Sequence, residues 1–425
     1  MKMSIRHARL AGGVCCGCVL ALSIWPAGAV ADWEAVPDVR MEVEANDNPR
    51  LGQRPEHRPL ADFDRTATRM LVDARMNLRN SGPRGSVTLQ PRIRADAYSD
   101  SRDSDLERQD IYLNSRANYD WQRARAGVNV NLNRESIISS ELSDLEPIEP
   151  GEPIDDPIDN ETGLLVLLDE FRNRVNLRPY AEFDISERSA ILMEARLLDI
   201  SYTGPELVGR TDFTDISLSL GVGRTIDSRT SATARMIVSN FEADLSGNET
   251  DTVGVEGTFS RELNELWSFN LTTGLQRSDF IFVDPVTSEI VDNAATNYTM
   301  SIGFAKRTEL SALDINLFRV LNPNAVGFLI ERNELRVRYA RQLSERLSAR
   351  IGFRAMETGA LEGISADRQL LRADIDVEWA FTPQWSFAAR LGAIDQEFAG
   401  ARLDGQANLL SVGAIYRGLS RRPVN

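Results

Sequence analysis

The chain has 425 residues, of which 42% are hydrophobic and 26% charged, and its formal net charge is −15 at pH 7. This acidic balance argues against a nucleic-acid-binding protein, which needs a basic face. Beyond the first 31 residues, no apolar run reaches the length that a transmembrane helix requires.

The first 31 residues have the three parts of a secretory signal peptide. A basic start, Met1 to Arg9, precedes an apolar run, and Ala29-Val30-Ala31 is a small-x-small cleavage site. An uncleaved membrane anchor is the alternative, but the apolar run is short and Pro26 follows it. All three cysteines lie in this segment, so residues 32–425 can form no disulfide and no thiolate metal site. We expect 1–31 to be removed and 32–425 to form one exported domain.

Apolar and polar residues alternate with period two through most of the remaining chain. This pattern places apolar side chains on one face of a β-strand and polar side chains on the other. In chain order, the predicted strands are 39–45, 70–78, 87–97, 111–121, 124–132, 172–185, 190–202, 212–226, 230–243, 250–262, 266–281, 294–307, 311–321, 335–340, 347–354, 367–381, 384–398 and 406–417.

The links between these strands alternate between two lengths. Short polar links lie near 82, 122, 187, 227, 264, 309, 344 and 383, with longer polar links between them. Short periplasmic turns and longer extracellular loops are typical of outer-membrane barrels, so we predict an all-β, antiparallel up-and-down transmembrane barrel of about 18 strands (16–18). Aromatic residues beside short turns predict a girdle at one membrane interface. They are Trp121, Trp267, Trp379, Phe381 and Trp385.

The segment 139–162 is the most biased in composition. It holds nine acidic residues and four prolines and no basic residue, which is typical of a solvated loop. In the predicted barrel it lies on the extracellular side. A divalent-cation site is the alternative, since Glu152, Asp155, Asp156 and Asp159 offer oxygen ligands, but their spacing does not match an EF-hand loop. We therefore predict no metal site and no cofactor.

The hairpin 333–356 shows the predicted two faces most clearly. Leu335, Val337 and Tyr339 form one face of its first strand, and the other face carries arginines. In a membrane barrel the apolar face contacts lipid and the arginines face the lumen. The candidate lumen residues of the whole chain are Arg92, Arg94, Arg116, Arg125, Arg172, Arg174, Arg178, Arg336, Arg338, Arg350, Arg354, Arg372, Arg390, Asp96, Asp120, Glu182, Asp184, Asp374, Asp376 and Glu378.

These lumen charges have two compatible interpretations. Paired arginines and carboxylates brace the wall, and the planar guanidinium suits buried pairing. Alternatively, charged side chains that line a pore favour solutes of opposite charge. A barrel of 16 to 18 strands is wide enough for an aqueous channel.

Two other protein classes are disfavoured. Apolar and polar residues would also alternate in a soluble secreted β-sandwich or solenoid. However, the polar faces here hold Arg, Asp, Asn and Gln too often to form the outside of a sandwich whose other face is mostly Ala, Val and Leu. An enzyme at the barrel rim would need a histidine beside a nucleophile or acid. Residues 32–425 contain one histidine, His57, between two prolines in a predicted loop, and no triad or metal motif. We predict that the protein is not an enzyme.

The start of the predicted mature chain, Trp33-Glu34-Ala35-Val36-Pro37, followed by Asn46-Asp47-Asn48, resembles a family of outer-membrane β-barrel porins associated with exopolysaccharide biosynthesis and export genes. The repeated Ser-Glu-Arg turns and Arg-bearing strands are similar too. The resemblance implies an outer-membrane location in a Gram-negative bacterium and transport of a polysaccharide or another solute. It also implies polysaccharide export proteins as partners.

Near the C-terminus, Ser411 to Tyr416 resembles the polar-x-Gly-x-x-aromatic signal of the outer-membrane assembly machinery, although Gly418 and a polar tail depart from it. The other expected partners are outer-membrane lipid and lipopolysaccharide. The predicted function is a passive channel, a porin, for polysaccharide or anionic solutes. The alternative is a non-conducting barrel that anchors or scaffolds a surface or secretion assembly.

Overall fold

The computed structural model describes residues 33–49, 51, 66–100, 106–137, 171–203, 210–244, 247–283, 290–324, 327–360, 367–398 and 405–419. The predicted signal peptide, His57 and the acidic loop 139–162 lie outside these ranges. No helix in the described ranges is both long and apolar enough to span a membrane.

The described chain is built from eighteen β-strands. They are β1 Trp33–Asn46, β2 Ala67–Gly82, β3 Gly85–Tyr98, β4 Arg108–Asp120, β5 Ala124–Ser136, β6 Phe171–Ser186, β7 Ser189–Thr203, β8 Phe213–Asp227, β9 Thr230–Ala243, β10 Glu249–Glu262, β11 Trp267–Val283, β12 Ile290–Arg307, β13 Ser311–Pro323, β14 Leu329–Ser344, β15 Leu347–Ala360, β16 Arg368–Ala380, β17 Trp385–Phe398 and β18 Gly405–Arg417.

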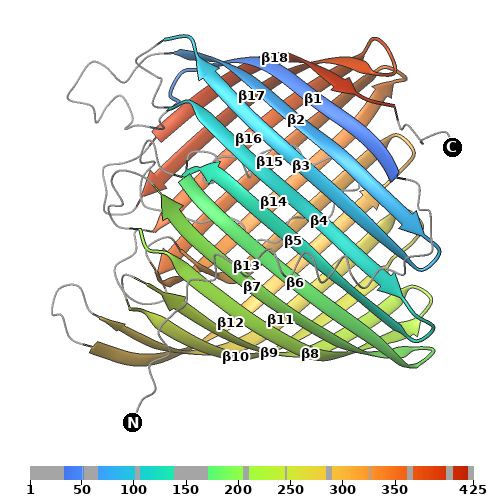
Figure 1. The fold of residues 1–425 in the computed structure, drawn as a ribbon, viewed down its shortest axis with the longest axis vertical. Helices are drawn as coiled ribbons and strands as arrows, with labels where there is room; N and C mark the ends of the chain where they lie inside the picture. Colours follow the sequence, from blue (N-terminus) through green and yellow to red (C-terminus); the bar gives the residue numbers. More distant parts are fainter. Residues whose placement is uncertain are drawn as a thin grey trace.

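Each strand pairs antiparallel with its neighbours in sequence, and β1 also pairs with β18. The sheet therefore closes on itself as an up-and-down barrel, with strongly tilted strands (Figure 1). Closure leaves no free sheet edge at the seam, where Asp38 pairs with Arg417 and Val43 with Val412. The predicted fold class, including 18 strands, is confirmed.

The alternation of side chains runs in the opposite sense to that of a soluble protein. In β16 the outward residues Leu371, Ile375 and Trp379 are exposed, whereas the inward residues between them are mostly charged and buried. The same exposed apolar face recurs on β8, whose Ile216, Leu218, Leu220 and Val222 all point outward, and on strands around the barrel. An apolar exterior around a polar interior is the arrangement that suits strands in a lipid bilayer.

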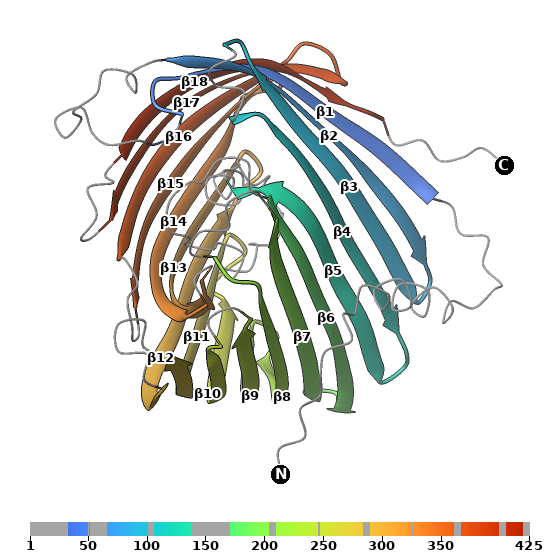
Figure 2. The same cartoon turned by 60° about the vertical axis from the view of Figure 1, so that its left-hand side comes forward.

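The two rims differ as the link lengths predict. The short turns, such as Gly82 to Gly85 and Ser344 to Leu347, all lie on the rim at the right of Figure 1, where β1 also begins and β18 ends. Figure 2 turns the opposite rim, where β2 begins and β17 ends, towards the viewer.

Aromatic rings gather on the outer surface beside the short turns. The ring centroids of Trp379, Phe381 and Phe387 lie within 6.2 Å of one another. Phe381 and Phe387 are stacked, with their centroids 4.8 Å apart. The ring centroids of Trp385 and Tyr416 are 5.0 Å apart, and similar aromatic pairs occur at the end of β4 and on β10 to β12. These rings form the girdle that the sequence predicts on this rim.

Candidate functional site

The inner surface of the barrel contains two arcs of different chemistry. The first arc runs from β14 through β18 and β1 to β6 and carries most of the candidate charges. The second arc, β10 to β12, carries mainly hydroxyl and amide side chains. We describe the charged arc first, because it holds the residues that the sequence singles out.

Glu334 is the centre of the densest ion-pair network. Its carboxylate is fully buried and contacts the guanidinium groups of Arg332, Arg336 and Arg354, with Arg354 Nε 2.9 Å from Glu334 Oε1. The register explains this cluster, since Arg336 on β14 stands opposite Arg354 on β15. Arg336 also lies over the inward ring of Phe318, 5.2 Å from its centroid. One carboxylate thus holds three arginines against the wall.

β16 supplies a second row of carboxylates at alternate positions. Asp376 accepts a hydrogen bond from Arg390 Nε at 2.7 Å, and Glu378 accepts one from Arg350 at 2.9 Å. Asp374 lies 3.6 Å from Arg372 Nε and packs against Gly352 of β15, where a Cβ atom would come within 2.6 Å of the carboxylate. The missing side chain at residue 352 therefore makes room for Asp374.

A third network links β1 to β4. Arg69 bridges Glu44 and Asp96, with N···O distances of 2.9 and 2.8 Å, and Arg108 donates to Asp96 from the other side at 2.7 Å. Arg92 Nε donates to Asp73 Oδ1 at 2.8 Å. Arg94 is buried beside this network and pairs in register with Asp73. The arginines of these strands are thus held in fixed positions by carboxylates of neighbouring strands.

The candidates on β4 to β6 differ most in burial. Arg116 and Arg125 are exposed to the lumen, where Arg116 donates to Asn129 at 2.8 Å and Arg125 to Asp120 at 2.6 Å. Arg172 is buried and pairs with Glu135, and Arg174 is buried one position further along the same face. Arg178 donates to Asn176 at 3.3 Å. The remaining candidates are Arg338, which is half-buried opposite Asp314 and Gly352, and Glu182 and Asp184, which lie near the short-turn end of β6.

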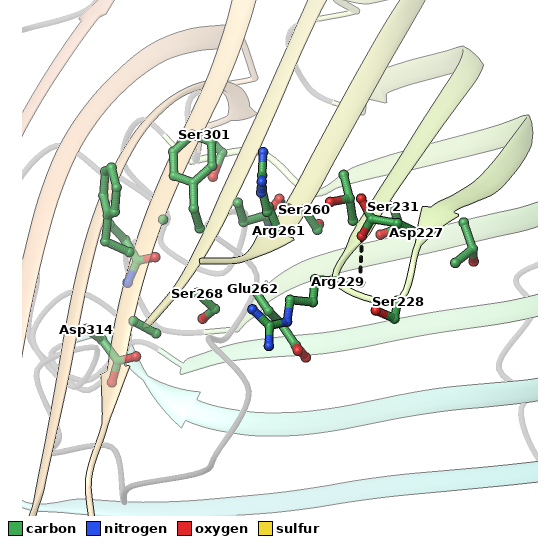
Figure 3. A pocket seen from close by; sticks show the side chains of 18 residues that line it. Asp227, Ser228, Arg229, Ser231, Ser260, Arg261, Glu262, Ser268, Ser301 and Asp314 are labelled. Carbon is green, nitrogen blue, oxygen red and sulfur yellow. Dashed lines mark hydrogen bonds between the residues drawn. The ribbon is translucent and has the colours of Figure 1, made fainter. Parts of the chain in front are cut away.

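The second arc is polar and largely uncharged. Cross-strand hydroxyl pairs join β10 to β11, with Thr252 2.8 Å from Ser278 and Thr258 3.1 Å from Thr272. Towards the short-turn rim, this arc surrounds a recess of about 460 Å³ that Ser260, Ser268 and Asn270 help to line. Figure 3 shows serines, Arg229 and Glu262 around this recess. Hydroxyl and amide groups can bind water or a neutral polar solute here.

The sequence pattern does not predict the inward apolar side chains of the long-loop half. One cluster consists of Ile137, Leu198, Ile200, Tyr202, Phe213, Phe241 and Ala243. A second consists of Leu51, Met356, Leu370, Ile394, Ala407 and Leu409. Adjacent apolar pairs mark several of these positions, because one member faces lipid and the other faces inward. Leu370-Leu371 and Leu409-Leu410 are examples, each with the first residue buried and the second exposed.

The lumen is therefore a polar, braced surface with apolar patches near the long-loop rim. In the described ranges, no group of three or more His, Cys, Asp or Glu side chains is placed to hold a metal ion. Arginines that are exposed to the lumen, such as Arg116 and Arg125, can contact anionic groups, and the hydroxyl arc can contact neutral polar groups.

Comparison with known proteins gives no match to a family model and no match to a curated protein. Among solved structures, Pseudomonas aeruginosa OccK2 (OpdF) is similar at a TM-score of 0.45 and 10% identity, covering 91% of this chain and 98% of that one. The outer membrane protein OpdK of the same organism gives 0.43 and 9%, covering 90% and 99%. A BenF-like porin from Pseudomonas fluorescens Pf-5 gives 0.43 and 9%, covering 92% and 99%.

Proposed function

We propose that this chain is a passive channel of the outer membrane of a Gram-negative bacterium, with a preference for anionic solutes. The single observation that carries the proposal is the combination of a closed 18-stranded barrel with an apolar exterior and a charged, hydroxyl-rich interior. A barrel of this strand number encloses a water-filled passage, and bacterial outer membranes are where such barrels occur. Outer-membrane lipid and lipopolysaccharide would surround it, and the outer-membrane assembly machinery would insert it.

The charge balance of one wall supports the preference for anions. On β14, β15 and β16 the inward arginines outnumber the inward acids. The arginines are Arg332, Arg336, Arg338, Arg350, Arg354, Arg368 and Arg372, and the acids are Glu334, Asp374, Asp376 and Glu378. Because like-signed surplus charge on a pore wall attracts counter-charged solutes, this wall favours carboxylates, phosphates or an acidic polysaccharide.

Planar-bilayer recording of the refolded protein tests both parts of the proposal. We expect steady conductance in potassium chloride and a reversal potential, under a salt gradient, that indicates chloride preference. Arg338→Ser should reduce that preference, because it removes a positive charge from the inner wall. Arg277→Ser is the matched control, since this arginine points outward on β11 and should leave the reversal potential unchanged. Absence of conductance at every voltage would refute the channel.

The alternative function is a non-conducting barrel that anchors or scaffolds a surface assembly. The specific observation in its favour is the packing inside the long-loop half, where Leu51 and Leu329 join the two inward apolar clusters. A barrel without conductance that copurifies with polysaccharide export proteins would support this alternative. The association with exopolysaccharide genes stays a prediction from the sequence resemblance.

A further inference from the structure

The inner wall contains a second recess at the short-turn rim, next to the hydroxyl-lined one. It has a volume of about 530 Å³ and lies where β12 to β18 reach this rim. This volume falls within the range of about 300–1,000 Å³ that is typical of small-molecule sites. Its lining includes more arginines than acids. The arginines are Arg307, Arg341, Arg346, Arg350 and Arg417, and the acids are Glu309 and Glu378.

Small side chains leave the space for this recess. One ladder row joins β12 to β15 through Arg307, Ala312, Ala340 and Arg350. The two arginines are three strand spacings apart, which is about 14 Å at ~4.8 Å per strand. The two alanines between them fill little of that distance. The inward residues nearer the rim are small too, namely Ser348, Ala380 and Ser386.

Glu378 holds two of the arginines at the edge of the recess. Arg350 Nη2 donates to Glu378 Oε2 at 2.9 Å, and Arg417 Nη2 donates to the same oxygen at 3.1 Å. The carboxylate is buried, whereas both arginines are half-buried and line the recess. Because a guanidinium has five N–H donors, Arg350 can donate to a second anion while it keeps this bond.

The other arginines give the recess its surplus of positive charge. Arg307 donates to Asp314 at 2.7 Å, so this pair is neutral. Arg417 Nε also lies 3.6 Å from Asp38. Arg341 and Arg346 are exposed, and neither has an ion-pair partner among the residues that the structure describes. An anion that enters the recess therefore meets paired arginines in its wall and further positive charge at its rim.

We propose that this recess binds a phosphorylated sugar. A phosphate monoester carries a charge of about −1.5 to −2 at pH 7 and three acceptor oxygens. Arg346, Arg350 and Arg417 can therefore contact it from different sides. The side chains of Ser348 and Gln384 belong to the same lining and can contact the sugar hydroxyls. The proposal rests on the proposed function, because the ligand reaches this rim through an anion-preferring channel.

Glu378 is the counter-ion that the ligand displaces. It neutralises Arg350 and Arg417, and the phosphate competes with it for the same guanidinium groups. This competition keeps the binding reversible, as passage through a channel requires. Removal of the Glu378 carboxylate should therefore strengthen binding, whereas removal of Arg350 should weaken it.

Current block in planar bilayers tests the site in the unmodified protein. Glucose 6-phosphate should reduce the chloride current in a saturable manner. Inorganic phosphate lacks the sugar hydroxyls and glucose lacks the charge, so each should block about tenfold more weakly. Equal block by all three, or no block by glucose 6-phosphate, would overturn the site and leave the channel intact.

Titration calorimetry of the refolded protein in detergent measures the same binding without a current. A protein that binds glucose 6-phosphate but does not conduct would overturn only the proposed function. A protein that conducts but gives no binding heat and no block would overturn only the site.

Two substitutions should change the affinity in opposite directions. Glu378→Gln keeps the shape of the side chain and should tighten binding of glucose 6-phosphate by about threefold to tenfold, whereas Arg350→Gln should weaken it about tenfold. If both substitutions shift the dissociation constant in the same direction, Glu378 does not compete with the ligand and the proposal fails.

Two further variants keep the test decisive if those ion pairs prove necessary for folding. Arg346→Ser, in the exposed β14–β15 turn, should weaken binding about threefold. Arg123→Ser is the matched control, since Arg123 is exposed in the β4–β5 turn and does not line the recess. Ala340→Leu fills the recess without changing a charge, so it should weaken binding about tenfold and leave the reversal potential unchanged. Unchanged binding in Ala340→Leu would show that the ligand does not occupy the recess.

Discussion

Replacing Glu334 by glutamine should destabilise the barrel more than most single substitutions. The change keeps the shape of the side chain but leaves Arg332, Arg336 and Arg354 without their common carboxylate. At an effective dielectric constant of 20, each charge pair at about 4 Å is worth roughly 4 kcal/mol before desolvation is counted. Because desolvation offsets much of this, we expect a net loss of about 3–5 kcal/mol, as is typical when one partner of a buried pair is removed.

Equilibrium unfolding of the protein refolded in lipid vesicles measures this loss. The free energy of unfolding follows from a guanidinium titration monitored by tryptophan fluorescence, since five of the six tryptophans lie beyond residue 31. Glu331→Gln is the matched control on the same strand, because Glu331 pairs with Arg319 in a more exposed position and should cost at most about 1 kcal/mol. If the two substitutions destabilise equally, the buried network does not brace the wall.

Three further substitutions probe other parts of the barrel. Val337→Arg places a charge on the lipid face and should cost about 2–4 kcal/mol in the same titration, whereas Arg338→Ser should leave the unfolding free energy nearly unchanged. Gly352→Val should displace Asp374, because a Cβ atom alone would come within 2.6 Å of its carboxylate, and a shifted reversal potential in bilayers would report the moved charge. Leu198→Ala in the inward apolar cluster should cost about 2–5 kcal/mol, and a cost below 1 would show that the cluster is not packed.

The strands and their faces could be predicted from the sequence because both depend on local order. A period of two determines which side chains share a face, and the alternation of link lengths determines the two rims. β12 shows the limit, since the sequence predicts a start near 294 and the strand begins at Ile290. The alternation is weak near this end of the strand, where Asp292, Asn293 and Ala294 are all exposed.

The partners of the lumen charges could not be predicted, because they depend on register between strands. The sequence singles out Arg336 and Arg354 but not Glu334, which joins them. Likewise, the carboxylates that hold Arg69 come from β1 and β3. Only the pairing of β2 with both of these strands brings them together. The inward apolar clusters were missed for a different reason. Their residues break the alternation locally, and a simple two-face pattern assigns every apolar residue to lipid.

The seam between β1 and β18 has a consequence for how the protein is made. Arg417, near the end of the last strand, lies 3.6 Å from Asp38 on the first and also contacts Glu378 on β16. The ring can close only when nearly the whole chain has been synthesised, so its final step brings together residues at the greatest sequence distance. Until then both terminal strands present open edges. A translation product that stops before β18 would therefore keep open strand edges, and these edges would distinguish it from the complete barrel.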